Sequence, residues 1–189
     1  MKAYKYLMTS VFLSLLYSTT VPAAPDVAAG KEKGAMCFNC HGAEGNSKNP
    51  NFPSLAGQKP AYLVNQLRSF RSGTRTNGMM NHIASGLSNE EMNNLAAYFS
   101  SLKNKSAGGK KDLAKQGKPK ATLCFGCHGQ GAKGMGVTPR LAGQHPGYLQ
   151  KQLHAFKEGT RKNGPMRGIV GMLSDQDIKV VTEYMGSLK

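Results

Sequence analysis

After about its first twenty residues, the sequence has no segment that is apolar enough to cross a lipid bilayer. The one apolar stretch, at residues 7–17, is too short for a good transmembrane helix. It follows two early lysines and precedes Val21-Pro22-Ala23, an order that is typical of a secretory signal peptide. We therefore predict a signal peptide at 1–23 and a mature chain that is soluble or peripheral, with an uncleaved anchor as the alternative.

Acidic residues are scarce: ten Asp and Glu stand against 25 Lys and Arg, a formal net charge of +15. Without the predicted signal, residues 24–105 carry nine basic and five acidic residues, and residues 106–189 carry fourteen and five. The two halves thus have net charges of +4 and +9. Such a surface can steer association with acidic partners or anionic lipid head groups. Nucleic acid is not expected as a partner, because the chain has an export signal and no recognition motif. A solubilising surface is the alternative.

The sequence has only four cysteines, and all of them fall in two Cys-x-x-Cys-His pentapeptides, Cys37–His41 and Cys124–His128. This pattern is the attachment signature of c-type haem. The two thiols add to the porphyrin vinyl groups, and the histidine that follows supplies the proximal iron ligand. We predict two covalent haem c groups. The predicted attachment residues are Cys37, Cys40, Cys124 and Cys127, and the predicted iron ligands are His41 and His128.

Three other interpretations of the cysteines are less consistent with the sequence. A thioredoxin-like redox pair would need a βαβ context, which the sequence lacks. A zinc site would have to join pairs that are separated by 83 residues, and it would leave the histidine after each pair unused. Structural disulfides are compatible with an oxidising compartment. The duplicated pentapeptide favours haem over all three.

The chain contains two copies of one unit. Leu55-Ala56-Gly57-Gln58 recurs as Leu141-Ala142-Gly143-Gln144, an offset of 86 residues that holds along most of the repeat. The offset is 87 at the cysteines, so the loop after the first motif is one residue longer. We predict domains at 24–105 and 106–189. A stretch rich in Lys, Gly and Ser, at about 103–116, is expected to be the linker.

Neither copy has the alternating pattern of a β-strand, and the apolar residues recur at helical spacing. Residues 60–72 and 146–158 each have a proline at the start, and Gly follows both helical patterns at or just beyond their ends. Ser88 and Ser174 each precede an acidic residue by three positions, as in a capping box. We therefore expect an all-α fold with two tandem domains, each wrapped around one covalent haem.

The second axial ligand decides between an electron carrier and an enzyme, because an iron with only a proximal histidine keeps one position open. Met80 and Met166 occupy equivalent positions of the repeat, and a soft thioether suits haem iron. We predict them as the distal ligands. Met79, which lies opposite Pro165, is the alternative in the first unit. We interpret as ordinary surface residues three histidines without counterparts: His82, His145 and His154.

Taken together, these residues resemble the two-haem cytochrome c4 family. The resemblance covers nearly the whole mature chain and includes Cys-x-x-Cys-His-Gly and the stretch Pro53-Ser54-Leu55-Ala56-Gly57-Gln58 with its counterpart. It implies two cytochrome c domains that face each other near the haem propionates. It also implies a periplasmic location, often at the membrane surface, and electron transfer to redox partners. Expected partners are a terminal oxidase, a quinol–cytochrome c reductase or a similar protein with an acidic docking surface.

The resemblance also implies a role for two prolines near the predicted haems. The carbonyls of Pro53 and Pro139 are expected to accept hydrogen bonds from the proximal histidines, which would orient the rings and raise their basicity. Arg75 and Arg161 are candidates to pair with propionates, because a guanidinium matches a carboxylate; a solvated arginine is the alternative.

Three functions are compatible with these features. The first is an electron carrier without enzymatic activity, in which both irons are bound by His and Met. The second is the cytochrome subunit of a larger enzyme, such as a flavoprotein sulfide dehydrogenase. The third is a two-haem peroxidase, which would need an open iron site and acid–base groups nearby. The matched methionines argue against the third.

Overall fold

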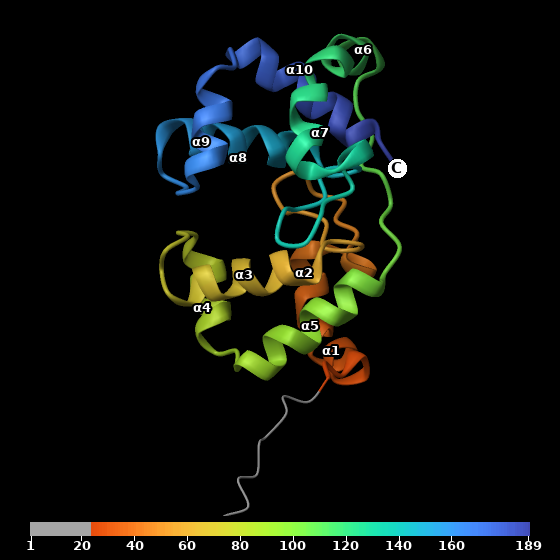
Figure 1. The fold of residues 1–189 in the computed structure, drawn as a ribbon. Helices are drawn as coiled ribbons and strands as arrows, with labels where there is room; N and C mark the ends of the chain where they lie inside the picture. Colours follow the sequence, from red (N-terminus) through yellow and green to blue (C-terminus); the bar gives the residue numbers. More distant parts are fainter. Residues whose placement is uncertain (1–23) are drawn as a thin grey trace, which may run out of the picture.

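The computed structural model describes residues 24–189, and the predicted signal peptide at 1–23 lies outside the described residues. Within 24–189 the chain consists of helices and loops, and its only paired extended backbone is a bridge between Met135 and Thr138. Figure 1 shows two helical units, one above the other, with the first in red to light green and the second in green to blue. The all-α prediction is confirmed.

The two units present the same order of helices in the described range. The first contains α1 (Val27–Gly34), α2 (Phe38–His41), α3 (Pro60–Arg71), α4 (Gly78–Ser85) and α5 (Asn89–Ser101). The second contains α6 (Lys111–Lys120), α7 (Thr122–His128), α8 (Pro146–Glu158), α9 (Gly164–Gly171) and α10 (Asp175–Ser187). Short 3₁₀ turns lie at Ala35–Cys37, Ala43–Gly45 and Gln130–Ala132.

Both predicted capping boxes are present at the starts of α5 and α10. Ser88 Oγ accepts a hydrogen bond from the Glu91 amide at 3.0 Å, and Glu91 Oε2 accepts one from the Ser88 amide at 2.8 Å. Ser174 and Asp177 make the same reciprocal pair at 3.1 and 3.0 Å. Each box satisfies two amides that have no partner inside the helix, so the local sequence fixes where these two helices begin.

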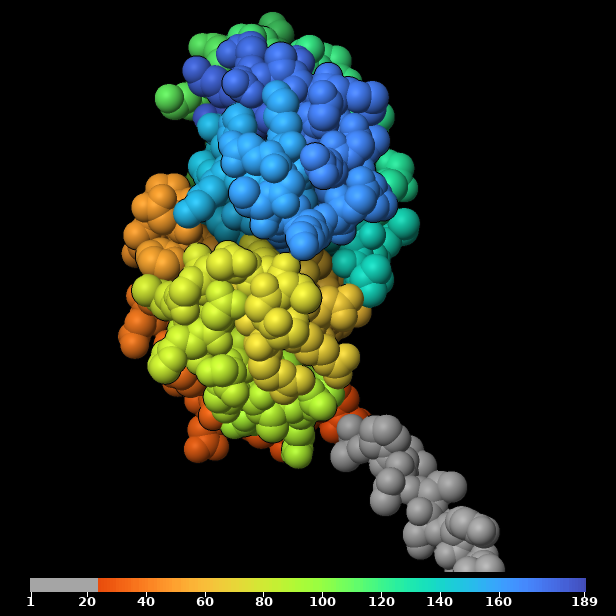
Figure 2. All heavy atoms as spheres, turned by 90° about the vertical axis from the view of Figure 1, so that its left-hand side faces the viewer, coloured from red at the N-terminus to blue at the C-terminus, as the bar shows by residue number. Residues whose placement is uncertain are grey.

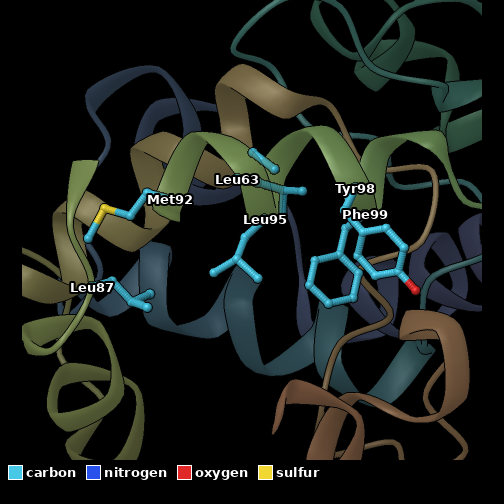
Figure 3. Packing of buried hydrophobic residues seen from close by; sticks show 7 residues of the cluster. Leu63, Leu87, Met92, Leu95, Tyr98 and Phe99 are labelled. Carbon is cyan, nitrogen blue, oxygen red and sulfur yellow. The ribbon is translucent and has the colours of Figure 1, made fainter. Parts of the chain in front are cut away.

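The core of the first unit forms where α3 packs on α5 (Figure 3). Its buried members are Leu63, Leu87, Met92, Leu95, Ala96, Tyr98 and Phe99. Cys37 and Phe38 are half-buried against this cluster, so the haem-attachment segment is anchored to the core. In the second unit Cys124 and Phe125 pack in the same way against a cluster that includes Leu149 and Met185.

In each unit one helix crosses the last helix at very close range. A Cβ added to Gly30 of α1 would overlap the carbonyl oxygen of Asn94 on α5. A Cβ on Gly117 of α6 would overlap the carbonyl oxygen of Val180 on α10. The expected linker at 103–116 is wrong in its second part, because α6 begins at Lys111 and uses this glycine to approach its neighbour.

The segment between α5 and α6 runs along one side of both units, in green at the right of Figure 1. Asn46 of the first unit holds its beginning: the side chain donates to Lys103 O at 3.1 Å and accepts from Lys105 N at 2.7 Å. The same segment also contacts the second unit: Asn104 Nδ2 donates to Ala142 O at 3.3 Å, and Ser106 Oγ donates to Gly186 O at 2.6 Å. Figure 2 shows that the two units also touch each other directly.

Candidate haem-binding site

The two thiols of each pentapeptide are placed by a single turn of helix. Cys37 closes a 3₁₀ turn, and Cys40 lies three residues later in α2; in the second unit both cysteines belong to α7. Residues three apart lie on the same face of a helix, so both thiols of a pair can meet one ligand. None of the four cysteines forms a disulfide, and burial raises the pKa of the Cys37 and Cys124 thiols. The residues thus offer the thiols that thioether formation needs.

The histidines of the motifs are buried and held by proline carbonyls, as the resemblance implied. His41 Nδ1 lies 2.8 Å from Pro53 O, and His128 Nδ1 lies 2.9 Å from Pro139 O. A carbonyl oxygen can only accept, so Nδ1 must carry the hydrogen and Nε2 keeps its lone pair. Neither Nε2 has a hydrogen-bond partner among residues 24–189. This is the tautomer that a metal-binding imidazole requires.

Burial also sets the charge of the two imidazoles. It lowers the pKa of His41 and of His128, although the hydrogen bond to each proline carbonyl acts in the opposite direction. Both rings are therefore neutral at neutral pH and available as ligands. Two free thiols beside a neutral imidazole with an unused Nε2 are the donor set that c-type haem needs, so the residues present fit this group.

The predicted distal methionines lie at equivalent places, in the first turns of α4 and α9. Asn77 Oδ1 accepts from the Met80 amide at 3.1 Å, and Asn163 Oδ1 accepts from the Met166 amide at 3.1 Å. Both methionine side chains are half-buried, whereas Met79 is 54% exposed. Met166 contacts a buried cluster of Phe156, Val170 and Ile178. The burial pattern favours Met80 over Met79, and the assignment stays a prediction.

The two arginines that we considered as propionate partners join the two units. Arg75 donates to Gln66 Oε1 of its own unit at 2.6 Å and, across the interface, to Tyr148 OH at 3.0 Å and Gln152 Oε1 at 2.8 Å. Its guanidinium lies 4.5 Å above the ring of Phe70. Arg161 makes the mirror-image contacts, to Gln152, Tyr62 and Gln66, at distances within 0.1 Å of these. The interface therefore has approximate twofold symmetry.

The interpretation of His145 as a surface residue is wrong. It is buried, and its Nε2 lies 2.8 Å from Ser47 O of the other unit. The contact is a property of the interface, and a single sequence contains no signal for it. His82 is exposed as expected, and His154 is half-buried with its Nδ1 4.0 Å from Asp175 Oδ1.

Comparisons with known proteins agree with this geometry. The family model for cytochrome c matches the chain twice, at residues 27–103 and 114–189. A cytochrome c4 from Pseudomonas aeruginosa is 38% identical over 197 residues, which cover 96% of this chain and 98% of that protein. The chain belongs to the cytochrome c4 family. The crystal structure of reduced cytochrome c4 from Pseudomonas stutzeri superimposes with a TM-score of 0.83 and 37% identity, over 88% of this chain and 100% of that one.

Membership of the cytochrome c4 family fixes the main features of the molecule. It consists of two tandem cytochrome c domains, each with one covalent haem c attached through the two cysteines of its motif, and it transfers electrons. A second kind of relative, a thiosulfate dehydrogenase electron acceptor from Stutzerimonas stutzeri, is 37% identical and covers 84% of this chain. No helix within residues 24–189 has the length and apolar character that a membrane span requires.

Proposed function

We propose that this chain is a periplasmic electron carrier in which both irons are bound by one histidine and one methionine. The ligands would be His41 and Met80 in the first domain, and His128 and Met166 in the second. The observation that carries the proposal is the pairing of these residues across the repeat, with each imidazole fixed by a proline carbonyl and each methionine half-buried. When bound, haem iron supplies reversible one-electron chemistry, and the protein holds its ligands in place.

A carrier without enzymatic activity follows from the same arrangement. If both axial positions are filled by side chains, no position is left for a substrate to bind to the iron, and the site changes little on reduction. We also assign residues 24–105 and 106–189 to the two domains. Two hydrogen bonds near this boundary support the assignment: the Lys105 amide donates to Asn46 of the first unit, and Ser106 Oγ donates to Gly186 O of the second.

The test is a spectrum together with a haem count on the mature protein. Mass spectrometry after denaturation should show two haem masses per chain. The oxidised protein should have a weak sulfur-to-iron band at the far-red end of its spectrum, and the reduced protein should not bind carbon monoxide. Binding of carbon monoxide at one of the two haems would instead support the peroxidase type of function.

A second candidate function is the electron-accepting subunit of a sulfur-compound dehydrogenase. It is favoured by the likeness to thiosulfate dehydrogenase electron acceptors, which are 37% and 34% identical over more than four fifths of this chain. Affinity purification of the chain from its own periplasm distinguishes the two. A stoichiometric dehydrogenase that survives high salt would identify a subunit, whereas loss of all partners in salt would identify a carrier that docks transiently on acidic partners.

A further inference from the structure

Two buried glutamines connect the units at the same peptide bonds that hold the proximal histidines. Gln144 is 6% exposed and reaches into the first unit, where its Oε1 accepts from Ser54 N and its Nε2 donates to Ser54 O, both at 2.9 Å. Gln58, also 6% exposed, does the same to Arg140 in the second unit, at 2.7 and 2.9 Å. The side-chain amide of each glutamine thus forms hydrogen bonds with both the backbone N–H and the backbone C=O of one residue in the opposite domain.

Each of these residues, Ser54 and Arg140, directly follows the proline whose carbonyl accepts a hydrogen bond from the proximal histidine. The carbonyl of Pro53 and the amide of Ser54 are the two ends of one peptide group. The carbonyl accepts from His41 Nδ1 at 2.8 Å, while the amide donates to Gln144 Oε1 at 2.9 Å. An unbroken hydrogen-bonded line therefore runs from His41 through this peptide to a side chain of the other domain.

The second line is the mirror image of the first. It runs from His128 Nδ1 to Pro139 O at 2.9 Å, and from the amide of the same peptide, at Arg140, to Gln58 Oε1 at 2.7 Å. Each glutamine is also fixed within its own domain, because its Oε1 accepts a second hydrogen bond from the backbone amide of the next residue. Gln58 Oε1 accepts from Lys59 N, and Gln144 Oε1 accepts from His145 N, both at 3.0 Å. The side chains of Gln58 and Gln144 therefore have defined positions.

From these contacts we infer that Gln144 is a positioning residue for His41, and that Gln58 is one for His128. Each domain thus adjusts the iron ligand of the other. The inference rests on the proposed function, in that it takes the two histidines as iron ligands. Hydrogen bonds at the two ends of one peptide polarise each other, so an acceptor at the amide makes the carbonyl a stronger acceptor. A stronger acceptor at Nδ1–H makes the imidazole more basic, and a more basic ligand favours the ferric state.

The sign of the effect follows from this order of steps. Removing the amide of Gln144 weakens the pull on the His41 proton, so the first haem becomes easier to reduce. Removing the amide of Gln58 does the same to the second haem. The two substitutions should therefore shift the distribution of a single electron between the haems in opposite directions, each by about twofold to fivefold.

The experiment compares Gln144→Met and Gln58→Met in the two-haem protein, since methionine retains the length of the side chain without the amide. The reduction potential of each haem is measured by spectroelectrochemistry, with the haems assigned by NMR of the oxidised protein. The Nδ1 protons of His41 and His128 are followed in the reduced, diamagnetic protein. Tyr148→Phe is the matched control, because it removes an interdomain hydrogen bond from Arg75 and touches neither proline peptide.

We expect Gln144→Met to raise the potential of the first haem and to move the His41 Nδ1 proton signal upfield, and Gln58→Met to do so only for the second domain. Tyr148→Phe should leave both unchanged. Equal shifts at both haems, or equal effects of Tyr148→Phe, would overturn the inference and leave the glutamines as interface contacts only. If a methionine variant does not fold, Gln144→Asn and Gln58→Asn withdraw the amide while retaining polarity, with the same expectations. A wild-type protein without the sulfur-to-iron band would instead refute the proposed function.

Discussion

Two adjacent thioethers in the first domain, Met79 and Met80, allow a sharp test of the distal ligand. Met80→Ala should remove about half of the far-red sulfur-to-iron band, because one of two equivalent Met–iron bonds is lost. It should also open one haem to cyanide or carbon monoxide. Met166→Ala should do the same for the other haem. The measurement is the absorption spectrum of the oxidised protein, with a ligand titration of the reduced protein.

Met79→Ala is the matched control. Met79 is 54% exposed, and the equivalent position in the second domain is occupied by Pro165. It should leave the band and the ligand binding unchanged. If Met79→Ala opened the first haem and Met80→Ala did not, the assignment of the distal ligand in that domain would be wrong.

At the scale of residues, the sequence was informative where chemistry is local. The spacing of Cys37, Cys40 and His41 is dictated by one ligand and one turn of chain, so five consecutive letters identify it. The partners of Gln58 and His145 lie in the other domain, more than 80 positions away in the sequence. Nothing near these residues in the sequence signals such contacts, so the sequence alone predicts a surface position for a histidine without a counterpart in the repeat.

At the scale of helices, the close crossing of α6 and α10 gives a second test. Gly117→Ala would drive a methyl group into the carbonyl oxygen of Val180, and only a shift of one helix could relieve the overlap. We expect a loss of about 2–4 kcal/mol in the free energy of unfolding, as for other overpacked or distorted cores. Thermal unfolding followed by circular dichroism measures the loss.

Gly168→Ala is the control for this change. Gly168 also lies inside a helix, α9, but a Cβ there would meet nothing within 4 Å. That substitution should stabilise the helix by up to about 1 kcal/mol, because alanine is the better helix former. If both variants lost stability alike, the close crossing of α6 and α10 could not be the cause of the loss in Gly117→Ala.

Gly117 illustrates what the sequence could and could not predict about the helices. Their starts were predictable where proline and capping boxes act within four residues, as at Ser88 and Ser174. The start of helix α6 was not, since the run of Lys and Gly before it reads as a linker. Its buried residues, Ala114 and Gly117, are small because α10 lies so close, and this requirement becomes visible only when both helices are in place.

At the scale of the molecule, Arg75 and Arg161 are expected to keep the two domains docked. Each makes two hydrogen bonds across the interface, and each stacks on a phenylalanine of its own domain. The double variant Arg75→Ala with Arg161→Ala should therefore loosen the interface while both domains stay folded. The connecting segment at 102–110 should then be cleaved by trypsin at least about fivefold faster, since local opening governs such cleavage.

The repeat in the sequence predicted two similar domains, and it could not predict how they face each other.

Lys151→Ala, on the same helix as Gln152 and exposed, is the control for the double arginine variant. An unchanged rate of cleavage in the double arginine variant would mean that the glutamine contacts and the connecting segment suffice for docking.

The uneven charge of the two domains, +9 against +4, bears on how partners dock. Not all of that charge is free: Lys157 donates to Leu173 O and Asp175, and Arg71 donates to Leu87 O and Asn89. Exposed residues are therefore the better probes. We expect electron transfer to an acidic partner to slow by on the order of tenfold as salt rises from low to physiological strength, because screening removes the steering field.

Charge reversal then locates the docking surface. Lys151→Glu with Lys162→Glu, both exposed on the second domain, should slow the bimolecular rate at low salt more than Arg68→Glu with Lys48→Glu on the first. Each pair changes the net charge by the same amount, so a difference between them reflects position and not total charge. Stopped-flow rates at several salt concentrations decide the matter. A rate that does not respond to salt, or equal effects of the two pairs, would mean that the basic surface serves solubility and does not guide the partner to the second domain.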